Sequence, residues 1–179
     1  MHWSAASAAP VTYTVDPDHT YPSFEADHMG ISVWRGKMTK TGGTIVYDKA
    51  DGRGTVDITI DPDSIDFGQK QLNSWARSDQ FFDTAEHPTA RYMGRFESLR
   101  NGVPTRVAGE LTLRGVTRPV NLDIAWIKCA THPLLRREVC GADASGSFNR
   151  DEFGLGAGKD YGFKMAVDLR IQVEALAPR

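Results

Sequence analysis

The sequence predicts an all-β fold, either an antiparallel barrel or a sandwich, on three observations. Apolar and polar residues alternate with period two along much of the chain. Residue pairs that favour tight turns separate the alternating segments, at Asp51-Gly52, Asn101-Gly102 and Arg114-Gly115. Helical periodicity is confined to one short stretch. Many strands with few helices are typical of barrels and sandwiches.

Four segments show the alternation most clearly, because one face carries apolar side chains and the other carries polar ones. In chain order they are 24–28, 55–60, 120–126 and 167–174. Further strands are expected at 12–15, 31–38, 44–47, 90–96, 107–113 and 139–148. Gly42-Gly43 opens the strand at 44–47.

The alternation stops between Gln69 and Phe82. Leu72, Trp75 and Ala76 fall at positions i, i+3 and i+4, which predicts a short helix over 69–77 with one apolar stripe. Ser78 then predicts a cap for a further helical turn that ends at Phe82. The sequence thus predicts strands with a short helical excursion in their middle.

Composition limits the class of protein. The 179 residues suit one domain, which we expect over 11–177, and 40% of them are hydrophobic, enough for a core. The 21 basic and 23 acidic residues nearly cancel and are interspersed, so we expect no binding to nucleic acid. No apolar run approaches the ~18 residues that cross a bilayer, so we expect no membrane span.

The first ten residues contain Ala6-Ser7-Ala8, which fits the end of a secretory signal. The apolar region that normally precedes such a site is missing, so we expect 1–10 to be a flexible signal remnant or a tag. The alternative is the flexible tail of a cytosolic protein.

Cys129 and Cys140 lie eleven positions apart, as expected for a loop that joins two strands. A disulfide there would contribute about 3 kcal/mol on the chain-entropy estimate and would suit an oxidising compartment. A metal site formed with His132 lacks a fourth ligand and ranks lower. Two buried free thiols are the remaining alternative.

The chain contains no nucleophile elbow, phosphate loop or zinc-protease motif, so we expect neither catalysis nor a metal or other cofactor. A barrel of about eight strands can instead be filled by its own side chains or enclose one slender ligand. Large apolar side chains on inward registers are the candidates to line such a cavity, although residues of this kind more often form a dry core. The candidate ligand-binding residues are Phe24, His28, Trp34, Met38, Trp75, Phe81, Phe82, Phe96, Leu111, Leu113, Leu122, Ile124 and Trp126.

Several motifs in order along residues 11 to 175 resemble the YceI-like family. They are 13–19 (YTVDPDH), 28–30 (HMG), 77–83 (RSDQFFD), 87–89 (HPT), 109–120 (GELTLRGVTRPV) and 149–154 (NRDEFG). The resemblance implies an eight-stranded, lipocalin-like antiparallel barrel that is exported to the bacterial periplasm. It also implies a long polyisoprenoid ligand, of the polyprenyl-diphosphate or quinone type, with its tail in the barrel. Cys129 and Cys140 resemble a subgroup that has a disulfide-tied hairpin.

On this basis we expect a periplasmic carrier or store of an isoprenoid lipid, with no turnover. Asn73, Arg77 and Ser78, together with His28, are the candidate headgroup contacts near the helical excursion. One alternative is a module that binds a partner, for example a membrane redox protein, and would expose a large apolar patch. An enzyme that modifies a lipid is the third possibility, and homodimer formation is left open.

Overall fold

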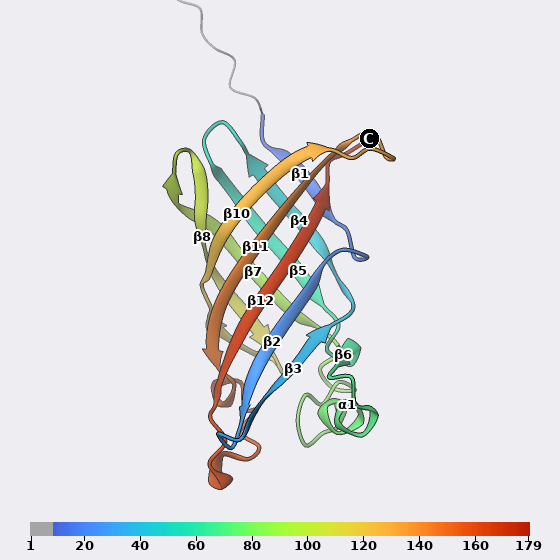
Figure 1. Cartoon of the computed structure of the whole chain (residues 1–179), viewed down its shortest axis with the longest axis vertical. Helices are drawn as coiled ribbons and strands as arrows, with labels where there is room; N and C mark the ends of the chain where they lie inside the picture. Colours follow the sequence, from blue (N-terminus) through green and yellow to red (C-terminus); the bar gives the residue numbers. More distant parts are fainter. Residues whose placement is uncertain (1–8) are drawn as a thin grey trace, which may run out of the picture.

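The computed structural model describes residues 9–179, and twelve strands dominate it (Figure 1). The expected signal sequence at 6–8 lies outside the described residues. The strands are β1 (Val11–Val15), β2 (Tyr21–His28), β3 (Ser32–Met38), β4 (Thr41–Asp48), β5 (Arg53–Ile60), β6 (Ile65–Asp66), β7 (Ala90–Arg100), β8 (Val103–Leu113), β9 (Val116–Pro119), β10 (Leu122–Thr131), β11 (Glu138–Asn149) and β12 (Ala166–Leu176). Helix α1 (Lys70–Arg77) and the 3-10 turns η1 (Pro62–Ser64), η2 (Arg150–Phe153) and η3 (Lys159–Tyr161) complete the fold.

Eight antiparallel strands close the barrel in the order β1-β4-β5-β7-β8-β10-β11-β12, and β12 pairs back with β1. The predicted all-β fold and its eight-stranded barrel are therefore confirmed. Each predicted strand segment overlaps an observed strand, because alternation over four to eight residues is a strong local signal for a strand with one buried face.

Beyond the short strand β1, the barrel wall is not closed by a continuous strand ladder. β1 pairs with only the last two or three residues of β12, and β2 takes the rest of the β12 edge, from Val167 to Gln172. β3 pairs with β2, and the two-residue β6 pairs with β3. In the described chain no ladder joins β6 or β3 to β4, so a seam remains there. Helix α1 lies beside this end of the barrel (Figure 1).

Two of the three predicted tight turns join adjacent strands directly, whereas Asp51-Gly52 ends the longer connection between β4 and β5, and only Gly52 has a positive φ there. Asn101 and Gly102 join β7 to β8 with φ of 52° and 80°, and Arg114 and Gly115 join β8 to β9 with φ of 50° and 72°. Two consecutive residues with positive φ match the right-handed twist of the flanking strands.

Helix α1 follows the predicted stripe, and the side chain of Gln69 caps it by accepting from the Leu72 N–H. The further helical turn expected from Ser78 to Phe82 is wrong. The Ser78 hydroxyl instead donates to the Trp75 carbonyl at 2.7 Å and ends α1, and the chain then runs through turns. Ser and Asp favour turns as well as caps, because their side chains bond nearby main-chain groups in either setting.

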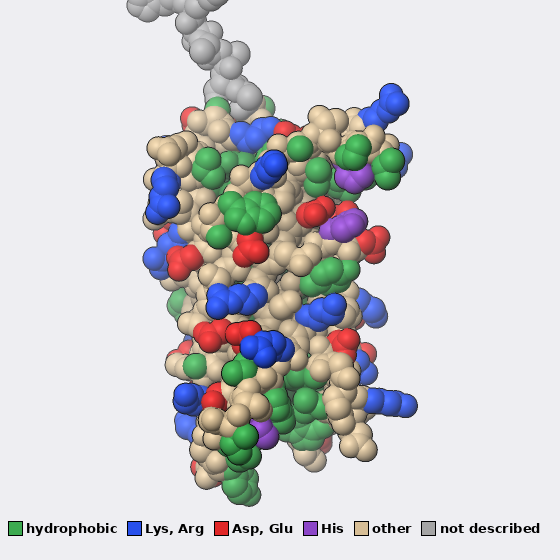
Figure 2. Space-filling view, in the orientation of Figure 1, with side chains coloured by type: hydrophobic (Ala, Val, Ile, Leu, Met, Phe, Trp, Pro, Cys, Tyr) green, Lys and Arg blue, Asp and Glu red, His purple; other side chains and the backbone are tan. Residues whose placement is uncertain are grey.

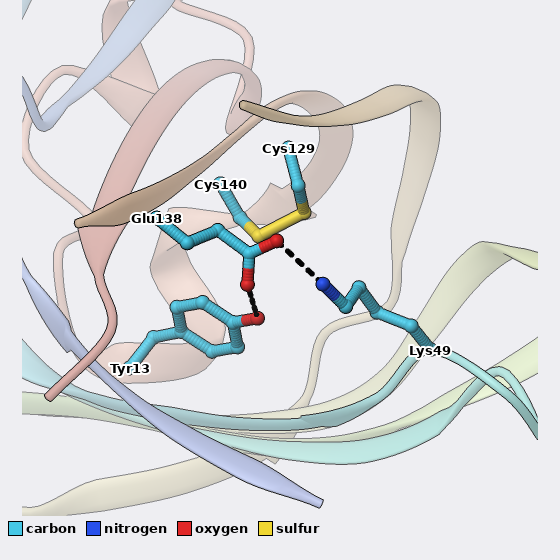
Figure 3. The surroundings of a disulfide bond; sticks show 5 residues. All are labelled: Tyr13, Lys49, Cys129, Glu138 and Cys140. Carbon is cyan, nitrogen blue, oxygen red and sulfur yellow. Dashed lines mark hydrogen bonds and ion pairs between the residues drawn. A yellow bond between two sulfur atoms is a disulfide. The ribbon is translucent and has the colours of Figure 1, made fainter. Parts of the chain in front are cut away.

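The end of the barrel near β1 is closed by packed side chains. Tyr13 and Tyr47 are 1% and 6% exposed and pack with Ala175 against Ile45, Phe96 and Ile127. Here Cys129 and Cys140 stand opposite each other on β10 and β11 and form the predicted disulfide (Figure 3). Because both sulfur atoms are bonded to each other, the free-thiol and metal-site alternatives are excluded.

Candidate functional site: an apolar cavity within the barrel

The barrel encloses a cavity of about 270 Å³, close to the lower end of the ~300–1,000 Å³ range of ligand pockets. Apolar side chains from nearly every strand form its wall. The inward residues of β12, Val167, Leu169, Ile171 and Val173, alternate with outward polar ones as the sequence predicts. Side chains therefore do not fill the interior of the barrel completely, as they would in a solidly packed core.

Eleven of the thirteen candidate ligand-binding residues line this cavity. They are Phe24, Trp34, Met38, Trp75, Phe81, Phe82, Phe96, Leu111, Leu113, Leu122 and Ile124. His28 is not part of the lining: its ring stacks on Trp34 at a centroid distance of 4.2 Å and contacts Phe163 edge-on. The His28 ring therefore packs against two residues of the cavity wall and does not line the cavity itself.

The inward placement of Trp126 is wrong. The β10–β11 register shifts between Ile124 and Trp126, so the side-chain alternation is interrupted there. A bulge of this kind moves every later residue to the other face. Trp126 is consequently 53% exposed, and Ile127 lines the cavity in its place.

Six aromatic rings gather at the end of the cavity next to α1, and we call this group the aromatic end. Its members are Phe24, Trp34, Phe67, Trp75, Phe81 and Phe163. Phe67 contacts Phe24 and Trp34 edge-on at 5.3 and 6.4 Å, and Trp75 stacks on Phe81 at 4.8 Å. These rings come from β2, β3, the segments around α1 and, for Phe163, the loop that precedes β12.

The structure places the candidate headgroup residues Asn73, Arg77 and Ser78 away from the cavity lining. Asn73 accepts from the Phe67 N–H and donates to Asp66, and Asp66 has its pKa lowered chiefly by this bond. Arg77 donates to the Ile65 carbonyl, and Ser78 donates to Trp75. Asn73 and Arg77 thus hold α1 on β6, and Ser78 closes the last turn of α1.

Five lining residues carry polar groups: Thr20, Asp27, Thr41, Tyr92 and Arg150. The Tyr92 hydroxyl donates to the Val120 carbonyl at 2.8 Å, and burial raises its pKa. No recorded hydrogen bond joins two of the five within the described chain. The site can therefore hold an apolar chain, and it offers no paired acid and base at its wall.

Sequence reasoning did not select Arg150 or Thr41. A signal for Arg150 was present, since it continues the inward period-two series of Ala142, Ala144 and Phe148 on β11. Thr41 has no comparable signal, because its burial depends on the seam between β4 and β6.

Charged side chains of both signs cover much of the outer wall, and hydrophobic ones gather toward its lower end (Figure 2). Exposed large apolar residues include Met29, Ile31 and Val33 around the β2–β3 turn, Leu134 and Leu135 between β10 and β11, and Tyr161 in η3. Within residues 9–179, no helix is both long and apolar enough to cross a membrane.

Comparison with known proteins matches residues 13–175 to the model of the YceI-like domain family. The chain is 30% identical over 180 residues to protein YceI of Escherichia coli O157:H7, covering 98% of this chain and 92% of that protein. It is also 30% identical to a UPF0312 protein of Pectobacterium atrosepticum, covering 85% of this chain and 80% of that protein.

Two solved structures, among others, share the fold. BcnA of Burkholderia cenocepacia superposes with a TM-score of 0.72 at 22% identity, covering 90% of this chain and 99% of BcnA. A domain from Saccharophagus degradans described as polyisoprenoid binding has a TM-score of 0.68 at 17% identity, covering 94% of this chain and 99% of that domain. The barrel architecture is thus common to chains with little sequence in common.

Proposed function

The chain belongs to the family of YceI-like domains, and we propose that it holds the tail of an isoprenoid lipid in its barrel and carries or stores that lipid in the periplasm. The observation that carries the proposal is the almost wholly apolar lining of the cavity within the barrel. The description of the Saccharophagus degradans domain as polyisoprenoid binding supports the choice of lipid class. The proposal includes no catalytic turnover and no cofactor.

The energetics favour such a ligand. Each buried CH₂ contributes about 0.8 kcal/mol, so a tail of several prenyl units binds well without specific polar contacts. The seam between β6 and β4 offers a route for the tail, because no strand ladder joins these two strands. The disulfide between Cys129 and Cys140 supports an oxidising compartment such as the periplasm.

A partner-binding module is less well supported. That alternative calls for one large apolar patch on the outer wall. The exposed apolar side chains of the described residues are divided between the lower end of the wall, around the β2–β3 turn, and other places such as the β10–β11 connection.

The direct test is organic extraction of the purified protein followed by mass spectrometry. We expect a polyprenyl species in stoichiometric amount. The delipidated protein should also bind geranylgeraniol, followed through its tryptophan fluorescence. If extraction yields no lipid and the delipidated protein does not bind this alcohol, the proposal is wrong.

A filled cavity gives the structural control. Ala144 is 7% exposed and lines the cavity, so Ala144→Leu places three extra carbon atoms inside it. We expect its affinity for geranylgeraniol to fall about tenfold or more, from the ~0.8 kcal/mol per displaced CH₂. The matched variant Ala130→Leu, at an exposed position of β10, should leave the affinity unchanged. Equal effects of the two variants would place the ligand outside the barrel.

A further inference from the structure

Arg150 is the one basic residue in the lining of the cavity, and it is only 7% exposed. Its guanidinium lies 5.8 Å from the ring centre of Phe81, which puts it at the aromatic end. Arginine is among the residues least often fully buried unless it is paired. Its position inside an apolar cavity therefore calls for a physical explanation.

The protein satisfies Arg150 only in part. Nη1 donates to the carbonyl of Leu155, and Nη2 donates to the carbonyl of Ala157 at 2.8 Å. A guanidinium has five N–H donors, so three remain beyond these two bonds. Both acceptors are neutral main-chain groups in the loop that follows Arg150.

The charge of Arg150 has no carboxylate partner among the ion pairs of the described residues. Its neighbour Asp151 instead pairs with Lys159 at 2.6 Å. The acidic lining residue, Asp27, accepts main-chain N–H bonds from Gly30 at 3.1 Å. A buried cation without an opposite charge costs free energy, which an anion in the cavity would offset.

We propose that Arg150 binds the anionic oxygens of a lipid phosphate at the aromatic end, with the tail running toward Tyr13 and Tyr47. This inference rests on the proposed function and assigns the headgroup class and its position. The planar fork of an arginine side chain matches the geometry of phosphate oxygens and forms charge-assisted hydrogen bonds with them. Arg150 thereby takes the role that the sequence suggested for Asn73, Arg77 and Ser78.

The test compares two ligands that have the same tail. Geranylgeranyl phosphate and geranylgeraniol are titrated into the delipidated protein at pH 7 by isothermal calorimetry. We expect the wild type to prefer the phosphate about tenfold or more, from the ~1.5–3 kcal/mol of a hydrogen bond to a charged group. Arg150→Met should abolish this preference for the phosphate over the alcohol.

A matched control separates headgroup binding from support of the loop. Arg114 donates to the Gly154 carbonyl at 2.9 Å, in the same loop, but does not line the cavity. Arg114→Met should therefore keep the phosphate preference. The wild-type comparison needs no variant, so the test survives if Arg150→Met does not fold.

Three results would overturn the inference. Equal affinity of the wild type for phosphate and alcohol would show that the cavity holds the tail without reading the headgroup, and the proposed function would stand. An equal loss of affinity for both ligands in Arg150→Met would show that Arg150 only shapes the loop. Binding of neither ligand to the wild type would overturn the proposed function together with this inference.

Discussion

The phenolic hydroxyl of Tyr13 donates a hydrogen bond to Oε2 of Glu138 at 2.6 Å, although 125 residues separate the two along the chain (Figure 3). The other carboxylate oxygen of Glu138 accepts from the ammonium group of Lys49. This triad joins β1, the end of β4 and the start of β11 beside the disulfide. It therefore links the first strand to the last third of the chain at the closed end of the barrel.

Tyr13→Phe is expected to lower the free energy of unfolding by about 1 to 2 kcal/mol, the worth of a hydrogen bond to a charged group that keeps another partner. The ring stays buried, so packing is preserved. Urea unfolding followed by tryptophan fluorescence measures the loss. Tyr21→Phe is the control, because the Tyr21 hydroxyl bonds only the nearby Asp18 carbonyl in an exposed turn. Equal losses of unfolding free energy in the two variants would show that the bond between Tyr13 and Glu138 contributes no more than a local bond in an exposed turn.

Glu138 also predicts an acid-dependent stability. Its hydrogen bonds to Lys49 and then to Tyr13 hold its pKa below the ordinary value of 4.5. As the pH falls, Glu138 therefore takes up a proton in the unfolded chain before it does so in the folded protein. The stabilisation of the folded protein is complete above pH 4.5 and is lost as the pH falls through the lower pKa of the folded state.

Glu138→Gln should be less stable than the wild type at pH 7, and the gap should narrow as the pH falls from 5 toward 3. Unfolding midpoints at several pH values test this. Glu110→Gln is the control, since Glu110 is exposed and forms no ion pair in the described chain. A stability difference between Glu138→Gln and the wild type that stays constant with pH would contradict the attribution of this acid dependence to Glu138.

Reduction of the Cys129–Cys140 bond should destabilise the protein by up to about 3 kcal/mol, because the bond closes a short loop in the unfolded chain. Urea unfolding with and without dithiothreitol measures the effect, and the intact mass should rise by two hydrogens on reduction. The Cys129→Ala/Cys140→Ala double variant should match the reduced wild type and should not respond to dithiothreitol. A response of the double variant would point to another cause.

Thr41→Val should stabilise the unliganded protein by about 1 kcal/mol. The Thr41 hydroxyl is buried at the seam and has no hydrogen-bond partner, and a buried polar group without a partner costs about 1–3 kcal/mol. Thr20→Val is a matched control in the same lining, because the Thr20 hydroxyl bonds both main-chain groups of Glu174. Thermal unfolding should rank Thr41→Val above the wild type and Thr20→Val below it. The same ranking for both variants would contradict this account.

The local patterns of the sequence did not predict β6 and β9, but they predicted ten of the twelve strands, the turns at Asn101-Gly102 and Arg114-Gly115, the helix at 70–77 and eleven residues of the cavity wall. These features follow from local patterns: period two selects the inward side chains of β12, and the Asn101-Gly102 pair suits a two-residue turn because both residues tolerate positive φ. The family resemblance added the number of strands and the class of ligand.

Only the tertiary structure decided which polar residues face the cavity. The bulge after Ile124 turns Trp126 outward. This bulge arises from the pairing of β10 with β11, so the local alternation of residues could not predict it. Asn73 and Arg77 looked free in the sequence, but contacts with Asp66 and Ile65 engage them. Arg150 lies inside because the loop to Ala157 folds back over the barrel and supplies carbonyl groups to its guanidinium. Burial of a polar side chain depends on partners far along the chain or across a loop, and no local pattern of residue types specifies those partners.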